Sequence, residues 1–160
     1  MIRLAVTGHR GLGENTAALV DAALRHEIAE RAENGPVVGV SCLADGADAL
    51  FARAVLDQGG ELQVIVPAHR YRDDLPADHH ATYDALIDAA AEVTRLDHVE
   101  SDSEAHMEAS LRMLAGVDEL LAVWDGQPAR GYGGTADVVA AARGRAVRVT
   151  VVWPPGAVRD

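Results

Sequence analysis

The chain contains no lysine: all fourteen basic residues among its 160 are arginines. A Walker-type phosphate loop requires a lysine, and a pyridoxal phosphate enzyme requires an amine nucleophile. We therefore expect neither a Walker-type ATP site nor pyridoxal phosphate as a cofactor. The 25 acidic residues outnumber the arginines, and the formal net charge is −11. Because nucleic-acid binding depends on a concentrated basic face, this charge predicts that nucleic acid is not a partner.

The sequence is also poor in cysteine and in long apolar runs. Cys42 is the single cysteine, which excludes an internal disulfide and favours a cytoplasmic location. We expect this thiol to be buried and inert. No apolar run approaches the roughly 20 residues of a membrane helix, and no signal segment precedes the strand-like residues 2–6, so neither a membrane partner nor export is expected.

Apolar, β-branched stretches alternate with alanine-rich segments of helical period, and this alternation predicts the fold class. We expect an α/β, Rossmann-like, three-layer fold in which helices flank a mostly parallel sheet of about six strands, all within a single domain over residues 1–160. The expected strands are 3–7, 37–42, 62–66, 93–96, 119–124 and 147–153. The expected helices are 14–33, 47–58, 81–91, 103–115 (capped by Ser103) and 135–143.

Residues 67–80 lack clear periodicity and are rich in Arg, Asp, Pro and His. We interpret this stretch as an exposed loop and a candidate lid. Its histidines, His69, His79 and His80, show no ligand spacing typical of zinc sites, so a solvated loop is favoured over a metal site.

Three loops follow strands, and ligands of open parallel sheets bind at the carboxyl ends of the strands. The first loop, 7–13, contains three glycines, and we predict ligand-binding roles for Gly8, His9 and Arg10. The glycine order is the reverse of the dinucleotide fingerprint, and no acidic residue ends the second strand, which argues against a conventional NAD site. A tight turn without a ligand is the alternative.

The second loop, 41–48, leads into the helix expected at residue 47. A hydroxyl, a glycine and free amides at a helix start attract anions. The candidate ligand-binding residues are therefore Ser41, Asp45, Gly46 and Asp48. For Asp45 and Asp48, capping of the helix is the alternative role.

The third loop, 124–137, carries adjacent glycines followed by threonine at a helix start, as phosphate recognition requires. Here we expect Asp125 to hold ribose hydroxyls or carry a proton, and Tyr132 to stack on a base or pack the loop. The candidate ligand-binding residues are Trp124, Asp125, Gly126, Arg130, Gly131, Tyr132, Gly133, Gly134 and Thr135.

These three motifs, Thr-Gly-His-Arg, Ser-Cys-Leu-Ala-Asp-Gly-Ala-Asp and Trp-Asp-Gly…Gly-Tyr-Gly-Gly-Thr, together resemble the SLOG superfamily. That group includes DprA-type proteins and LOG-type phosphoribohydrolases, whose signature is P-G-G-x-G-T-x-x-E. When its Gly-Thr is aligned with Gly134-Thr135, Val138 stands at the glutamate that the family uses in catalysis, and Asp137 lies one position earlier. A one-residue shift turns a helical side chain by about 100°. The phosphate-binding half of the signature is thus better kept than the catalytic half.

The leading hypothesis is therefore a domain that binds or senses a nucleotide or phosphorylated nucleoside, with no metal or other cofactor. One alternative is a LOG-type hydrolase of the N-glycosidic bond of nucleoside 5′-monophosphates, with Asp137 and Asp125 as the candidate catalytic residues. A second alternative is a non-catalytic structural or adaptor domain. The alanine-rich helix 136–142 and the resemblance to dimeric LOG-type proteins also predict a homodimer.

Overall fold

The computed structural model describes all residues, 1–160, and contains one sheet of six parallel strands. The strands are β1 (Ile2–Gly8), β2 (Val37–Ser41), β3 (Glu61–Ala68), β4 (Glu92–His98), β5 (Glu119–Val123) and β6 (Arg148–Val151). The helices are α1 (Glu14–Ala32), α2 (Ala47–Asp57), α3 (Tyr71–Asp74), the 3₁₀ turn η1 (Ala77–His79), α4 (His80–Ala89), α5 (Ser103–Leu114) and α6 (Thr135–Gly144). The predicted α/β class and parallel sheet are confirmed.

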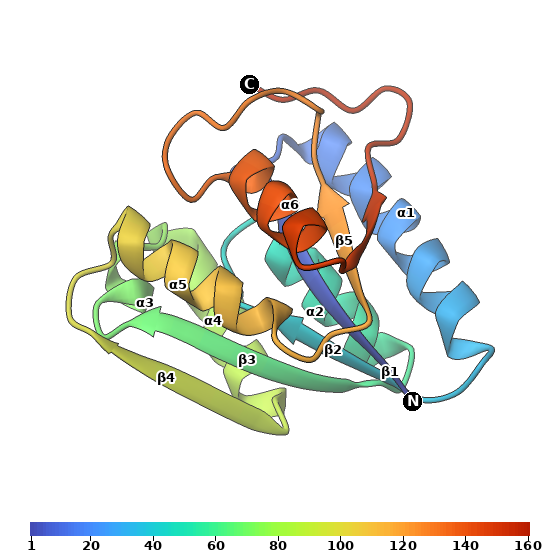
Figure 1. The fold of residues 1–160 in the computed structure, drawn as a ribbon, viewed down its shortest axis with the longest axis horizontal. Coiled ribbons are helices and arrows are strands. Elements are labelled where there is room, and N and C mark those ends of the chain that lie inside the picture. Colours follow the sequence, from blue (N-terminus) through green and yellow to red (C-terminus); the bar gives the residue numbers. More distant parts are fainter.

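The strand order is β4-β3-β2-β1-β5-β6, so the direction of winding reverses between β1 and β5. The helices form layers on both faces of the sheet, with α5 and α6 on one side and α1, α2 and α4 on the other (Figure 1). β1 shows both layers, since Leu4 and Val6 pack with α1 and α2, whereas Ala5 packs with residues of α5 and α6. A reversal of this kind is where parallel sheets open a crevice at the carboxyl ends of their strands.

The segment 67–80 is not the exposed loop that its polarity suggested. It forms the end of β3, then α3 and η1, and buries Tyr71, Leu75 and His79. These residues recur every four positions, so each short turn anchors one side chain, while Pro76 prevents the turns from joining into one helix. The His79 ring bonds the Leu43 carbonyl (2.9 Å), which ties the segment to the loop after β2.

The cap of α5 also differs from the expectation. Asp102, not Ser103, precedes the helix, and its Oδ1 accepts the N–H of Ala105 (2.9 Å). A carboxylate at this position satisfies a free amide and also favours the positive helix end, so it is at least as good a cap as the hydroxyl one residue later.

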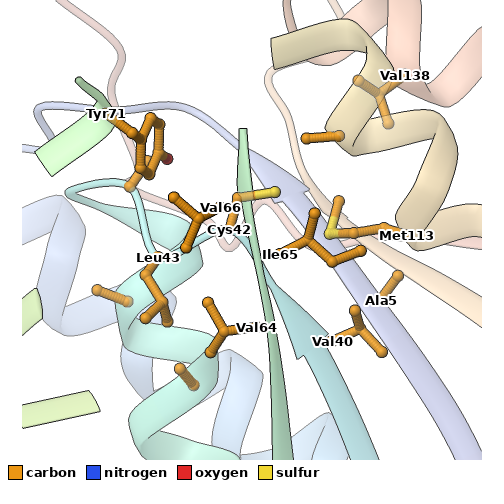
Figure 2. Packing of buried hydrophobic residues seen from close by; sticks show 14 of the residues in the cluster. Ala5, Val40, Cys42, Leu43, Val64, Ile65, Val66, Tyr71, Met113 and Val138 are labelled. Carbon is orange, nitrogen blue, oxygen red and sulfur yellow. The ribbon is translucent and has the colours of Figure 1, made fainter. Parts of the chain in front are cut away.

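Glycine at the centre of the sheet allows α2 to press on β2. A Cβ on Gly39 would lie 2.7 Å from Val55 Cγ2 and 3.0 Å from Phe51 Cε1, both from α2. Figure 2 shows the neighbouring cluster, in which Val40, Val64 and Ile65 lie along β2 and β3. The helix therefore sits close enough to fix the loop from which it begins.

We predict that Gly39→Ala lowers the free energy of unfolding by about 1–3 kcal/mol, because the added methyl overpacks the interface between α2 and β2. Gly144→Ala is the control, since its Cβ would meet nothing within 4 Å. That variant should be neutral or stabilise α6 by about 0.5–1 kcal/mol. Urea denaturation measures both; equal stability of the two variants would contradict the packing described.

Candidate functional site

A cavity of about 280 Å³ opens at the carboxyl ends of the strands, beside the winding reversal, and we call it the switch-point cavity. The turn after β1 lines it from Thr7 to Leu12, and the start of α6 lines it from Gly133 to Thr135. Asp48 of α2, Tyr71 of α3 and residues of α5 also line it. Segments far apart in the sequence thus meet at one rim of the sheet.

The β1 turn is held tightly against its neighbours. A Cβ on Gly8 would lie 2.4 Å from the Cβ of Ala47 and 2.7 Å from that of Val123, so no larger residue fits between α2 and β5. Gly46 has φ of 93°, and its Cβ would meet the His9 carbonyl at 2.7 Å. Both glycines therefore permit close packing of backbone, and only Gly8 also lines the switch-point cavity.

His9 connects the three segments of the rim. Its Nε2 accepts the N–H of Asp125 (3.1 Å), so the proton of the neutral ring lies on Nδ1, from which it is donated to Thr135 Oγ1 (3.3 Å). The imidazole is 2 % exposed and packs edge-on against Trp153. Burial, followed by the charge of Arg159, lowers the pKa of His9 and outweighs the opposing effect of Asp125.

Asp125 is engaged in ordering its own loop. One carboxylate oxygen accepts the N–H of Gln127 (3.0 Å) and lies 3.2 Å from His9 Nε2. Burial alone raises the pKa of Asp125, but the Gln127 amide and His9 together lower it below its ordinary value. Trp124 also orders this loop, since its indole N–H donates to the Gln127 carbonyl (2.8 Å). Neither residue lines the switch-point cavity.

The other predicted catalytic residue, Asp137, is also committed to the fold. Its Oδ2 accepts the N–H of Gly133 (2.9 Å), and this bond closes the glycine turn before α6. Gly133 has φ of 83°, which suits glycine, and a Cβ on Gly134 would lie 2.9 Å from that of Ala129. Asp137 lies outside the cavity lining, as do Gly126, Gly131 and the 63 % exposed Tyr132.

Asp45 positions an arginine and does not cap α2. Its carboxylate accepts Arg10 Nε (2.9 Å), pairs with Arg10 Nη2 (2.7 Å) and accepts the Gly11 N–H (3.0 Å). Ser41 is fully buried and structural, since its hydroxyl donates to the Asp48 carbonyl and accepts the Leu43 N–H. Of the second-loop candidates, only Asp48 lines the switch-point cavity.

Asp48 is the most unusual titratable group of the cavity. It lies in the first turn of α2 without being its N-cap, which is Gly46. Burial raises the pKa of Asp48 to about 7, offset only in part by the Ala44 N–H, which donates to its Oδ2 at 3.4 Å. Nearby, burial also raises the pKa of the Cys42 thiol well above its ordinary value, in agreement with the inert role expected for it.

Sequence reasoning missed the part of the cavity wall that α3 and α5 form. Tyr71, buried in a stretch interpreted as exposed, lines the cavity together with Cys42, which follows β2 (Figure 2). His106, Ser110 and Met113 of α5 complete this wall. Their spacing of four and three residues places them on one helix face, which was a signal available in the sequence.

Three arginines also line the cavity. Arg10, Arg130 and Arg159 all line it, and Arg130 Nη1 donates to the backbone carbonyl of Asp160. The segment before Asp160 is held in place by Thr16, whose hydroxyl accepts the Val158 N–H (3.0 Å). A chain of net charge −11 thus places three cations around one opening.

The fold is shared with solved structures that include DprA proteins, so the resemblance predicted from the sequence is confirmed at the level of fold. DNA processing protein A from Streptococcus pneumoniae has a TM-score of 0.67 and 17 % identity over 100 % of this chain and 52 % of its own. The Helicobacter pylori protein of that name is described with a single-stranded DNA binding mode. Its TM-score is 0.67 and its identity 16 %, over 94 % of this chain and 64 % of its own. The Moco carrier protein from Chlamydomonas reinhardtii has a TM-score of 0.57 and 18 % identity, over 96 % of this chain and 78 % of its own.

The chain spans only half to two thirds of the length of the two DNA processing proteins. No protein-family model and no curated protein matches the sequence. None of the helices is long and apolar enough to cross a membrane. The expected homodimer and cytoplasmic location stay predictions.

The exclusion of nucleic acid as a partner is wrong, because proteins with this same fold include one described as binding single-stranded DNA. Net charge sums the whole surface, whereas binding depends on the local charge. The arginines around the switch-point cavity show how an acidic chain can concentrate cations at one place.

We predict that His9 titrates below 6.5, whereas His98, whose pKa is raised by its bond to Glu108, titrates above 6.5. Histidine-selective NMR gives both values and also the Nδ1–H tautomer of His9. Because folding lowers the pKa of His9, its contribution to stability is complete above about pH 6.5 and is lost as the pH falls through the folded value. A His9 pKa at or above that of His98 would contradict the buried arrangement.

Proposed function

We propose that this chain binds a nucleotide or phosphorylated nucleoside in the switch-point cavity. The observation that carries the proposal is the meeting of the β1 turn and the glycine turn before α6 at one cavity beside the winding reversal. Open α/β sheets bind ligands at this place because loops there are free to shape a crevice while the strands hold them rigidly. The shared SLOG fold supports binding related to nucleotides.

The phosphate would lie at the start of α6. The first N–H groups of a helix have no partner within it, and the helix dipole adds partial positive charge at the same end. Thr135 lines the cavity and adds a hydroxyl, which His9 orients through a bond from its Nδ1 (3.3 Å). Arg10 and Arg130 add charge-assisted hydrogen bonds from the two facing turns.

The size of the cavity favours a single nucleotide unit. Its volume of about 280 Å³ lies just below the range of roughly 300–1,000 Å³ that is typical of small-molecule sites. A dinucleotide cofactor would need more room, which agrees with the reversed order of glycines in the first loop. The ligand would therefore place one phosphate, one sugar and one base between α6 and α5.

Binding is supported better than hydrolysis. A hydrolase of the LOG type needs a carboxylate free to stabilise positive charge on the ribose, whereas Asp137 holds the Gly133 amide and Asp125 holds that of Gln127. Both carboxylates lie outside the cavity lining. The proposed chemistry is therefore recognition, with the glycine turns held in shape by carboxylates that a hydrolase would use on its substrate.

Single-stranded DNA is a second candidate ligand, favoured by the likeness to the Helicobacter pylori DNA processing protein. A nucleotide unit of a strand presents the same phosphate and sugar as a free nucleotide. The exposed Arg10 and Arg130 stand on the rim, where a strand could pass. The acidic remainder of the surface would make such binding weak and strongly dependent on salt.

We predict that Arg130→Gln weakens the binding of nucleoside 5′-monophosphates by about 10- to 100-fold, the effect of losing one charge-assisted hydrogen bond. Arg143→Gln is the matched control, because it removes the same charge and Arg143 is exposed at the end of α6 that lies away from the cavity. Isothermal titration calorimetry measures both. Equal loss in the two variants would mean a general charge effect, and no binding to the unaltered chain would refute the proposal.

Fluorescence anisotropy with a labelled single-stranded oligonucleotide distinguishes the two ligands. If free nucleotide is the ligand, we expect weak oligonucleotide binding that disappears near physiological salt, and displacement of the oligonucleotide by excess mononucleotide. Oligonucleotide affinity at least 100-fold above that of the mononucleotide, with a steep salt dependence, would instead favour the single strand.

A further inference from the structure

Two residues that line the switch-point cavity, Asp48 and Tyr71, carry polar atoms without a hydrogen-bond partner in the protein. No group of the protein donates to Asp48 Oδ1, and its Oδ2 receives only the 3.4 Å bond from Ala44. All side-chain oxygens and nitrogens that are buried in this protein have a hydrogen-bond partner. Because Asp48 Oδ1 has no partner, it is not one of the buried atoms and is accessible to solvent. Since Asp48 lines the cavity, the cavity is what this oxygen faces.

Tyr71 shows the same feature. The residue is only 4 % exposed, its hydroxyl makes no hydrogen bond within the protein, and it also lines the cavity. Its ring packs edge-on against His106, with ring centroids 5.7 Å apart. His106 Nε2 bonds Ser101 Oγ (2.7 Å), which leaves Nδ1 for another partner. The hydroxyl of Tyr71, whose ring is buried, and the free carboxylate oxygen of Asp48 are thus both open to the same cavity.

No cation of the protein forms an ion pair with Asp48. Arg10 is the arginine whose charge acts on the Asp48 carboxylate, but its guanidinium is paired with Asp45, with Nη2 at 2.7 Å and Nε at 2.9 Å from Asp45 Oδ1. An ionised carboxylate accepts hydrogen bonds and donates none. Burying it without donors is costly, and this cost appears as the raised pKa of Asp48. A ligand that brings N–H donors would relieve the cost.

The rest of the wall suits a flat, apolar ring. Met113 and Pro67 line the same cavity as the three polar residues, and a methionine thioether packs well on an aromatic face. Arg130 lines the cavity together with the glycine turn before α6. The start of α6 with Arg130 therefore suits the phosphate, and the wall that contains Asp48, Tyr71 and His106 suits the base.

We propose that Asp48, Tyr71 and His106 form a base subsite that selects guanine, whose N1–H and N2 amino group donate to the Asp48 carboxylate. The inference rests on the proposed nucleotide binding and names the base. Among the common bases, guanine presents two adjacent N–H donors on one edge, which matches the two oxygens of a carboxylate. The Tyr71 hydroxyl and His106 Nδ1 supply further polar contacts to the ring.

The experiment compares GMP, IMP and AMP by calorimetry with the full chain. IMP differs from GMP only in lacking the N2 amino group, so we expect it to bind about tenfold more weakly or worse, as the loss of one hydrogen bond to a charged group implies. AMP, which offers an acceptor in place of N1–H, should bind more weakly still. Affinities of the three within twofold would overturn the base subsite while leaving nucleotide binding intact. Failure of all three to bind would instead refute the proposed function.

Asp48→Asn tests the carboxylate itself by a change of preference. The asparagine amide can accept from N1–H and donate to a base oxygen, so this variant should lose at least tenfold in GMP affinity and gain affinity for XMP, whose C2 carries oxygen. Asp57→Asn is the control, since Asp57 ends the same helix and pairs with Arg25 on the surface (2.9 Å). An unchanged ratio of GMP to XMP affinity in Asp48→Asn would contradict the assignment. Should that variant not fold, the comparison of GMP with IMP on the unaltered chain decides alone.

Discussion

The structure depends on the close approach of the end of β1 to the elements on both sides of it. Gly8 allows Ala47 and Val123 to come within a distance that excludes any side chain between them. His9, the next residue, then bonds the start of the β5 loop and the start of α6. Because these contacts involve a buried, neutral imidazole and fixed backbone, the rim of the switch-point cavity is formed before any ligand arrives.

The proposed function explains how an acidic chain without lysine would recognise an anion. A helix start and three arginines line the cavity, so positive potential is local even though the net charge is −11. The proposed base subsite has the opposite preference, because Asp48 Oδ1 and the Tyr71 hydroxyl have no hydrogen-bond partner in the protein. A ligand with an anionic end and an N–H-bearing end is complementary to this division, and a nucleotide has both.

The alternation of apolar strands with alanine-rich helices was enough to predict six strands, their parallel sheet and the three loops at its rim. Side-chain roles were harder, since a hydrogen bond such as that of Asp137 to Gly133 depends on how a turn closes. Residues 67–80 were misjudged because three buried anchors at four-residue intervals are hidden among charges. Tyr71 belongs to this group, so one of the three residues of the proposed base subsite could not be found from the sequence alone.

The central claim is that the nucleotide occupies the switch-point cavity with its phosphate at α6 and its base at Asp48. NMR titration of ¹⁵N-labelled chain with GMP tests it most directly, because amide shifts report the place of binding residue by residue. The account predicts the largest shifts at Gly8, Thr135 and Asp48, with residues of β4 unchanged. Shifts confined to another surface, with these three amides unmoved, would contradict it.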